Sequence, residues 1–327
     1  MPQATRALRP DRRSRWTHST SSNGVALSRA DEAVGLAAAD LELLAMAAFL
    51  VGRDDEGARV MERAHHLYLE ASDPVGAARC AIWTGFGRFD MGELAQAIGW
   101  YSRAGKLLNR ADRDCAERGY LLVPDVLQSL DSDTEAAYRT AATIAEIGER
   151  CTDADLVTFA LHAQGRVRIR QGRVTEGMAL LDEAMVAVVV GELASPLFTG
   201  LIYCSVIDAC REVYDLGRAR EWTAALTRWC DAQPGLVNFT GQCLVHRAEI
   251  MQLRGEWRDS LEEARRAGER FSRGQRGGRR GLPLPAGRGA PAAGGVCRRR
   301  GGIPRRQRLG VAATARSVPV AAGPGPY

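Results

Sequence analysis

The histidines and cysteines are the residues of this sequence best suited to bind metal, but their spacing does not indicate a metal site. His65 and His66 are adjacent in "RAHHLYLE" and could bind a metal only with a ligand from elsewhere in the fold. His162 and His246 lie near positions of small residues, which favours packing. None of the eight cysteines belongs to a CxxC pair. Zinc sites and disulfide frameworks use tighter, repeated spacings, so we expect buried, reduced thiols and no metal.

A group of carboxylates near residue 150 has the residue types for acid–base chemistry. Glu146, Glu149, Asp153 and Asp155 surround an expected turn. Paired carboxylates can transfer protons, but at helix ends they commonly cap helices or face solvent. No Ser–His–Asp or Cys–His arrangement is marked by local sequence, and Lys106 in "RAGKLLNR" does not complete a GxxxxGK[ST] phosphate-binding motif. We therefore expect no enzyme activity and no cofactor.

Four aromatic residues form the candidate binding site. Trp222 and Trp229 are seven residues apart in "EWTAALTRWC", which places them on one helix face, and Tyr203 and Tyr214 flank the preceding helix. One interpretation is a concave groove that binds a peptide, a protein or a small-molecule effector, since aromatic side chains supply large contact surfaces. The other interpretation is ordinary packing in the core.

The elements that must position these residues are helices arranged in a repeat. Between residues 30 and 272, apolar residues recur at helical spacing, and Gly or Asp marks the breaks. A marker position recurs about every 40 residues, as Gly in most copies and near a serine in the loosest one: Gly52, Gly92, Ser132, Gly172, Gly217 and Gly255. Small residues at matching positions would let paired helices approach closely, and the marker Gly would end the first helix in a left-handed conformation.

This period resembles the tetratricopeptide repeat, a helix–turn–helix unit, in long or divergent copies. Each helix pair leaves an apolar face that only the next pair can cover. We therefore predict an all-α fold, a tetratricopeptide-like superhelix of antiparallel helix pairs over residues 30–272. The alternative is an irregular helical bundle.

Charge is distributed unevenly along the 327 residues. The net charge of +5 combines basic ends with a central part, residues 31–272, near −12. An acidic helical surface does not favour nucleic acid. No apolar run approaches the roughly 20 residues of a membrane span, and the N-terminus lacks the apolar region of a secretory signal. We expect a cytoplasmic protein without membrane contact.

The two ends differ in composition from the repeats. Residues 1–29 are basic and are expected to be disordered, as is the Arg/Gly/Pro-rich tail 273–327, which has twelve Arg and no acidic residue. Read one base out of phase, codons allowed by the tail give a further repeat with its Gly at position 294, about 39 residues after Gly255. One hypothesis is a frameshift near residues 273–280. The other is a genuine disordered tail that binds nucleic acid or anionic lipid.

Several segments resemble the helical-repeat arm of actinobacterial LuxR-type transcriptional regulators. They include "DCAERGYLLVPDVLQSL", "GLIYCSVIDACREVYDLGRAREWTAALTRWCDAQP" and "FTGQCLVHRAEIMQLRGEW", and the resemblance covers roughly residues 30–272. It implies a regulatory arm that binds a ligand or a protein. No helix-turn-helix follows here, so DNA binding is not expected of this chain. The alternative function is a stand-alone scaffold for protein–protein interaction. We expect self-association through the apolar face of the helix pair near 241–271.

Overall fold

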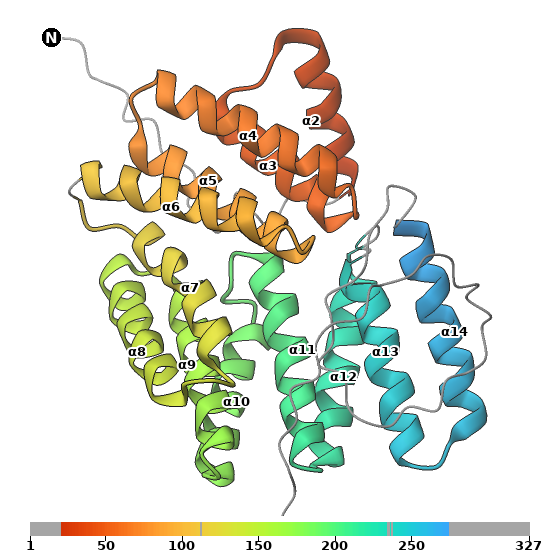
Figure 1. Cartoon of the computed structure of the whole chain (residues 1–327). Coiled ribbons are helices and arrows are strands. Elements are labelled where there is room, and N and C mark those ends of the chain that lie inside the picture. Colours follow the sequence, from red (N-terminus) through yellow and green to blue (C-terminus); the bar gives the residue numbers. More distant parts are fainter. Residues whose placement is uncertain (1–20, 112, 234–235, 237, 275–327) are drawn as a thin grey trace, which may run out of the picture. The chain divides into compact units, whose positions relative to one another are not determined.

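The structure is a computed structural model that describes residues 21–274 apart from 112, 234, 235 and 237 (Figure 1). Thirteen α-helices and no strand occur in this part of the chain, which confirms the predicted all-α class. Their bounds are α2 Ser21–Val34, α3 Ala38–Leu50, α4 Asp54–Glu70, α5 Pro74–Asp90, α6 Leu94–Ala111, α7 Glu117–Ser129, α8 Thr134–Cys151, α9 Ala154–Arg170, α10 Val174–Val189, α11 Pro196–Glu212, α12 Leu216–Asp231, α13 Asn238–Leu253 and α14 Trp257–Gly274.

The helices from α3 to α14 form six helix pairs that contact one another in chain order. Within each pair the first helix (α3, α5, α7, α9, α11 or α13) packs against the second, and each second helix packs against the next first helix. Consecutive first helices from α5 to α13 also contact each other. One cluster of buried apolar side chains extends from Leu41 to Ile250. The continuous interior expected of stacked helical hairpins is therefore present, and each pair covers an apolar face of its neighbour.

The turns inside the pairs explain most of the marker glycines. Gly52, Gly92, Gly172 and Gly255 all have φ between +75° and +79°, the left-handed region that a residue without Cβ enters at least cost. The prediction of Gly217 as the marker of the fifth pair was wrong. Tyr214 takes that turn with φ +60°, and Gly217 lies within the first turn of α12.

Small residues at the predicted positions bring paired helices close together. A Cβ added to Gly85 of α5 would lie 2.6 Å from the Tyr101 ring of α6, and one added to Gly177 of α10 would lie 2.6 Å from the carbonyl oxygen of Gly165 in α9. Contacts below 3.0 Å cannot be accommodated without movement. The glycines are therefore required by helix contact as well as by turns.

The expected boundaries of the repeat need one correction. Disorder was expected for residues 1–29, but α2 begins at Ser21, so residues 21–29 are helical. A two-point ion pair attaches this helix to α4, because Arg63 donates to both carboxylate oxygens of Asp31 at 2.6 and 3.0 Å. Helix α14 ends at Gly274, close to the expected limit at 272. The expectations for residues 1–20 and for the tail from 275 lie outside the described residues.

Candidate functional site

The structure brings together two of the four predicted aromatic residues. Tyr203 of α11 is 3% exposed, and its ring centroid lies 6.1 Å from that of the half-buried Trp229 of α12. Trp222 is also half-buried against the core, and its indole Nε1 has no hydrogen-bond partner among the described residues. Tyr203 and Trp229 therefore pack against each other between α11 and α12, and Trp222 packs against the core, which is the kind of surroundings that the second interpretation describes.

Tyr214 is not part of this group. It lies in the turn between α11 and α12, where its side chain is 79% exposed. Its amide donates to the carbonyl oxygen of Arg211 at 3.0 Å, as the turn residue after a helix does. Its left-handed φ of +60° gives Tyr214 the same role in the turn that the marker Gly has in other pairs.

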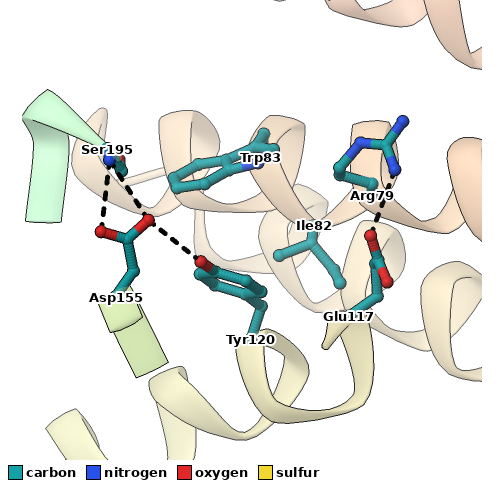
Figure 2. A pocket seen from close by; sticks show the side chains of 7 residues that line it. All are labelled: Arg79, Ile82, Trp83, Glu117, Tyr120, Asp155 and Ser195. Carbon is teal, nitrogen blue, oxygen red and sulfur yellow. Dashed lines mark hydrogen bonds and ion pairs between the residues drawn. The ribbon is translucent and has the colours of Figure 1, made fainter. Parts of the chain in front are cut away.

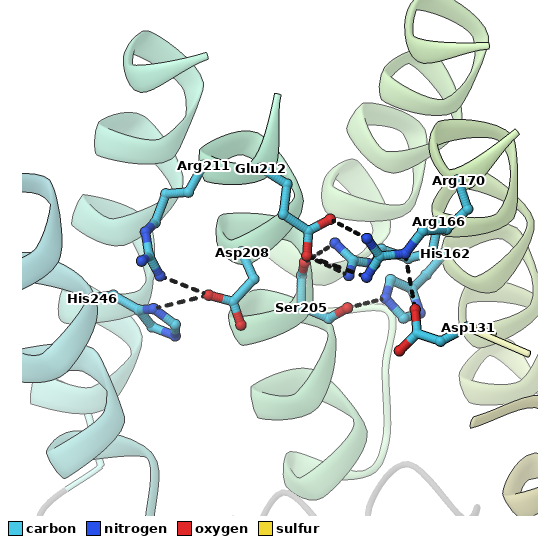
Figure 3. Close-up of polar contacts among 9 residues, drawn as sticks. All are labelled: Asp131, His162, Arg166, Arg170, Ser205, Asp208, Arg211, Glu212 and His246. Carbon is cyan, nitrogen blue, oxygen red and sulfur yellow. Dashed lines mark hydrogen bonds and ion pairs between the residues drawn. The ribbon is translucent and has the colours of Figure 1, made fainter. Parts of the chain in front are cut away.

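The most extensive polar cluster lies where the first helices α9 and α11 meet (Figure 3). The Arg166 Nη2 of α9 is 3.1 Å from the Glu212 Oε1 of α11, and Arg170 lies one turn further along α9 and contacts the same carboxylate at 3.4 Å. Arg170 is also 3.0 Å from Asp131. The exposed fractions of the side chains of Arg166, Glu212 and Arg170 are 11%, 30% and 35%. The cluster is therefore partly desolvated but still reachable from solvent.

His162 closes the buried end of this cluster. Its Nε2 is 2.8 Å from the Ser205 Oγ, and the ring is 1% exposed. Burial, together with the positive charge of Arg166, lowers the pKa of His162 to about 3, so the ring is neutral at pH 7. The sequence-based expectation that His162 has a packing role agrees with this burial.

A second polar cluster joins the first helices α3, α5 and α7, and sequence reasoning missed it. Arg79 of α5 contacts Glu42 of α3 at 2.6 Å and Glu117 of α7 at 3.1 Å. Both carboxylates are nearly inaccessible, at 4% and 2% exposed. A detectable signal exists, because Glu42 stands alone in the apolar run "LELLAMAAFL". An isolated charge in such a run is buried and needs a partner.

Next to this cluster lies a small cavity lined by residues of α5, α7 and α9 and by Ser195, which precedes α11 (Figure 2). Its volume of about 20 Å³ is enough for one water molecule. Asp155 forms one wall, where it accepts hydrogen bonds from the Ser195 amide at 3.2 Å and from the Tyr120 hydroxyl at 3.4 Å. Burial and the neighbouring Asp153 raise the pKa of Asp155 to about 6. Arg79 and Glu117 form the other wall.

The group of acidic residues near residue 150 was predicted to cap helices or to face solvent, and this is only partly correct. Asp153 caps α9 by accepting from the Leu156 amide, as expected. Asp155 was expected to face solvent or cap a helix, but it is 5% exposed and holds the backbone before α11. Asp155 therefore connects the pair that contains α9 to the pair that contains α11, and it does not form a solvent-exposed carboxylate pair with Asp153.

The other histidines and the cysteines considered as possible metal ligands have the following surroundings. His65 is buried, with Nδ1 2.7 Å from the Ala77 carbonyl oxygen and its ring against Trp100, whereas His66 is exposed. The seven cysteines among the described residues carry reduced thiols and form no disulfide with one another. In that part of the chain no helix combines the length and the apolar character needed to cross a membrane.

A further polar group lies between α11 and α13 and was not predicted from the sequence. It consists of Asp208, Arg211, His246 and Glu249. The residues from α11 are separated from those of α13 by more than thirty positions in the chain, so their approach is not visible in local spacing. Figure 3 shows Arg211 and His246 pointing toward the Asp208 carboxylate.

Comparisons with known proteins identify the fold and no more. No family model and no curated protein matches the chain. Among solved structures, a Rap protein complexed with Competence and Sporulation Factor is similar with a TM-score of 0.50 at 12% identity, over 72% of this chain and 75% of that one. A signal transduction ATPase with numerous domains and a tetratricopeptide repeat sensor, from Pyrococcus horikoshii, gives a TM-score of 0.45 at 10% identity, over 76% of this chain and 44% of that one. The described chain has a tetratricopeptide-like helical-repeat fold, similar to that of the Rap protein.

Proposed function

We propose that this chain is the effector-binding arm of a LuxR-like transcriptional regulator in the cytoplasm. In this proposal it binds a peptide or a segment of another protein on the face formed by its first helices. Its role is recognition rather than catalysis. A stand-alone scaffold for protein–protein interaction would use the same face and is the second candidate.

The observation that carries the proposal is the polar cluster between α9 and α11. Arg166 and Arg170 share the carboxylate of Glu212, and Arg170 also pairs with the exposed Asp131, so among the described residues Arg166 has no carboxylate to itself. Their partial exposure lets an incoming carboxylate or backbone carbonyl join the cluster. Arginine is favoured at protein–protein interfaces because its planar guanidinium group can donate several hydrogen bonds at once.

The size of the cavity between the first helices supports a ligand bound at the surface. About 20 Å³ holds one water molecule, whereas pockets that enclose small molecules have about 300–1,000 Å³. A peptide or protein segment laid across neighbouring helices needs no such cavity. The Rap protein of similar fold is in complex with Competence and Sporulation Factor. At 12% identity this supports only the idea that such a fold can carry a binding face.

Selection from a displayed library of random 12-residue peptides tests the proposal. The full chain is the target, and enriched peptides are then measured by fluorescence anisotropy. The test variant combines Arg166→Gln with Arg170→Gln on a first helix. The matched control combines Arg110→Gln and Arg220→Gln, two exposed arginines on the second helices α6 and α12. We expect the test variant to weaken binding by at least about tenfold, in line with the loss of a binding hot spot, and the control to leave it unchanged.

Two results would overturn the binding face. One is a selection that enriches no peptide, and the other is equal weakening by both double variants. Folding of each variant is checked by circular dichroism, so that loss of binding is not confused with loss of structure.

The gene separates the two candidate functions. An arm of a LuxR-like regulator predicts a helix-turn-helix encoded directly downstream, in the same or a shifted reading frame. A stand-alone scaffold predicts none. The nucleotide sequence also tests the frameshift hypothesis for the tail from 273. An out-of-phase frame that contains stop codons or lacks a helical pattern would eliminate that hypothesis.

A further inference from the structure

Three side chains with potential metal-binding atoms converge between α11 and α13. They are Asp208 of α11 and His246 and Glu249 of α13, and their nearest oxygen and nitrogen atoms all lie within 4.8 Å of one another. His246 Nδ1 is 3.7 Å from the Asp208 Oδ1 and 3.6 Å from the Glu249 Oε2. His246 and Glu249 are three residues apart on one helix, which places them on the same face.

The His246 ring is an unusual member of this group because it is fully buried without a hydrogen bond. Its exposed fraction is 0%, and neither ring nitrogen has a hydrogen-bond partner among the described residues. The Glu249 Oε2 has no hydrogen bond of acceptable geometry either. Buried polar atoms are nearly always hydrogen-bonded. Several buried atoms that lack hydrogen bonds and lie close together therefore indicate that a ligand binds between them.

The distances fit a shared cation better than direct hydrogen bonds. Separations of 3.6 and 3.7 Å are too long for hydrogen bonds between nitrogen and oxygen. Two ligands that bind one tetrahedral zinc ion at about 2.0–2.1 Å are about 3.3 Å apart. Each carboxylate is therefore within a few tenths of an ångström of this spacing from the imidazole, whereas the two carboxylates, which lie within 4.8 Å of each other, would have to approach by up to about 1.5 Å to share an ion.

Arg211 provides the positive charge of this group in the present structure. Its Nη1 is 2.9 Å from the Asp208 Oδ1 and 2.5 Å from the Glu249 Oε2. The side chain is 25% exposed, so it can turn toward solvent without crossing the core. A divalent ion would replace one charge by two and would neutralise both carboxylates, and it would compete with Arg211 for the same oxygens.

We propose that Asp208, His246 and Glu249 form a binding site for a divalent transition-metal ion, with Zn²⁺ as the best match. Zinc accepts imidazole nitrogen and carboxylate oxygen, and three protein ligands leave a fourth position open. Because its ligands come from both α11 and α13, a bound ion would link the first helices of the fifth and sixth pairs. The proposal does not depend on the proposed peptide-binding function, since the site is built from other residues.

Titration of the full chain with Co²⁺, followed by displacement with Zn²⁺, tests this site. Cobalt absorption in the visible range reports the coordination, and differential scanning fluorimetry reports the effect of zinc on the melting temperature. We expect Asp208→Asn and Glu249→Gln, which preserve side-chain size, to weaken metal binding at least about 10- to 100-fold, because even outer partners of a metal contribute that much. Arg211→Gln should strengthen binding, because it removes the competing cation.

The matched control is His65→Gln, which removes a buried histidine of α4 whose Nδ1 lies 2.7 Å from the Ala77 carbonyl oxygen, away from α11 and α13. It should leave cobalt binding unchanged. Unaltered affinity in Asp208→Asn and Glu249→Gln, or a sulfur-to-cobalt charge-transfer band in the wild type, would overturn the site and indicate binding by cysteines. Absence of cobalt binding to both the wild type and Arg211→Gln would also overturn the site, because the competing cation is gone in the variant.

Discussion

Arg79 and Glu42 form a two-point ion pair that joins α5 to α3. The Nε of Arg79 is 2.7 Å from one carboxylate oxygen and its Nη2 is 2.6 Å from the other. The same guanidinium donates to Glu117 of α7 at 3.1 Å. One arginine therefore connects three consecutive first helices, and two buried carboxylates depend on its charge.

Removal of this arginine should destabilise the chain strongly. We expect Arg79→Met to lower the free energy of unfolding by about 3–5 kcal/mol, the usual cost of breaking a buried ion pair on one side. Adding Glu42→Gln and Glu117→Gln should restore much of the loss, because no buried charge then remains. Urea denaturation measures both effects. Arg150→Met is the control, since its pair with Asp114 is more than half exposed and such pairs contribute little to stability. Equal losses in Arg79→Met and Arg150→Met would contradict the argument.

The turn residue Tyr214 offers a stabilising substitution. A left-handed φ costs an L-residue about 1–2 kcal/mol, and glycine avoids this cost but loses about 0.5–1 kcal/mol through backbone entropy. Because the side chain is 79% exposed, little packing is lost. We expect Tyr214→Gly to raise the free energy of unfolding by up to about 1 kcal/mol, while Gly172→Ala, at φ +79°, should lower it. A clear destabilisation by Tyr214→Gly would show that this ring has a contact role.

Two glycines should respond in opposite directions to the same substitution. Gly177→Ala places a methyl group 2.6 Å from the Gly165 carbonyl oxygen, so we expect a loss of about 1–3 kcal/mol from overpacking. Gly99→Ala in α6 meets no atom within 4 Å and should stabilise the helix by up to about 1 kcal/mol. Thermal melts of the two variants distinguish the signs. The close approach of α9 and α10 would be in doubt if both substitutions were neutral.

His162 should make the fold sensitive to acid. Its pKa is about 3 in the folded chain, against 6.5 in the unfolded chain. As the pH falls from 6.5 toward 3, the unfolded chain binds a proton that the folded chain does not, so stability is lost by up to about 1.4 kcal/mol per pH unit. We expect His162→Gln to reduce the loss of unfolding free energy between pH 7 and pH 5 by about 2 kcal/mol.

Asp155 provides a control because its effect on the pH dependence of stability has the opposite sign to that of His162. Its folded pKa of about 6 lies above the unfolded value of 3.8. Its contribution is therefore favourable below 3.8 and is lost as the pH rises through 6. Asp155→Asn should accordingly increase the loss of stability between pH 7 and pH 5. Denaturant titrations at the two pH values measure these shifts, and shifts of both variants in the same direction would contradict one of the two assignments.

The last helix is expected to mediate self-association. Trp257 and Leu261 lie four residues apart on α14 and are 60% and 63% exposed among the described residues. We expect the mass measured by sedimentation to rise with concentration for the wild type and to approach that of the monomer for Leu261→Glu. Val25→Glu, at another exposed apolar residue on α2, is the control and should not change the mass. A monomeric wild type at all concentrations would contradict the expectation.

The helices and their repeat could be predicted from the amino-acid sequence because the interactions that define them act over a few residues. Apolar spacing, turn glycines such as Gly92 and Gly172, and caps such as Asp153 all depend on neighbours within about one helical turn. The one turn misplaced by sequence, Gly217 for Tyr214, shows the limit of this approach. A strained tyrosine takes the left-handed position only because the helices on both sides are held by packing.

Which polar side chains meet could not be predicted from local sequence. Glu42 and Arg79 are 37 residues apart, and Arg166 and Glu212 are 46 apart, so no local spacing links them. His246 and Asp208 likewise meet only because α13 lies against α11. Local sequence marks where helices begin and end. The identity of the residues that share a buried charge depends on how successive pairs stack, which is set by packing of the whole interior.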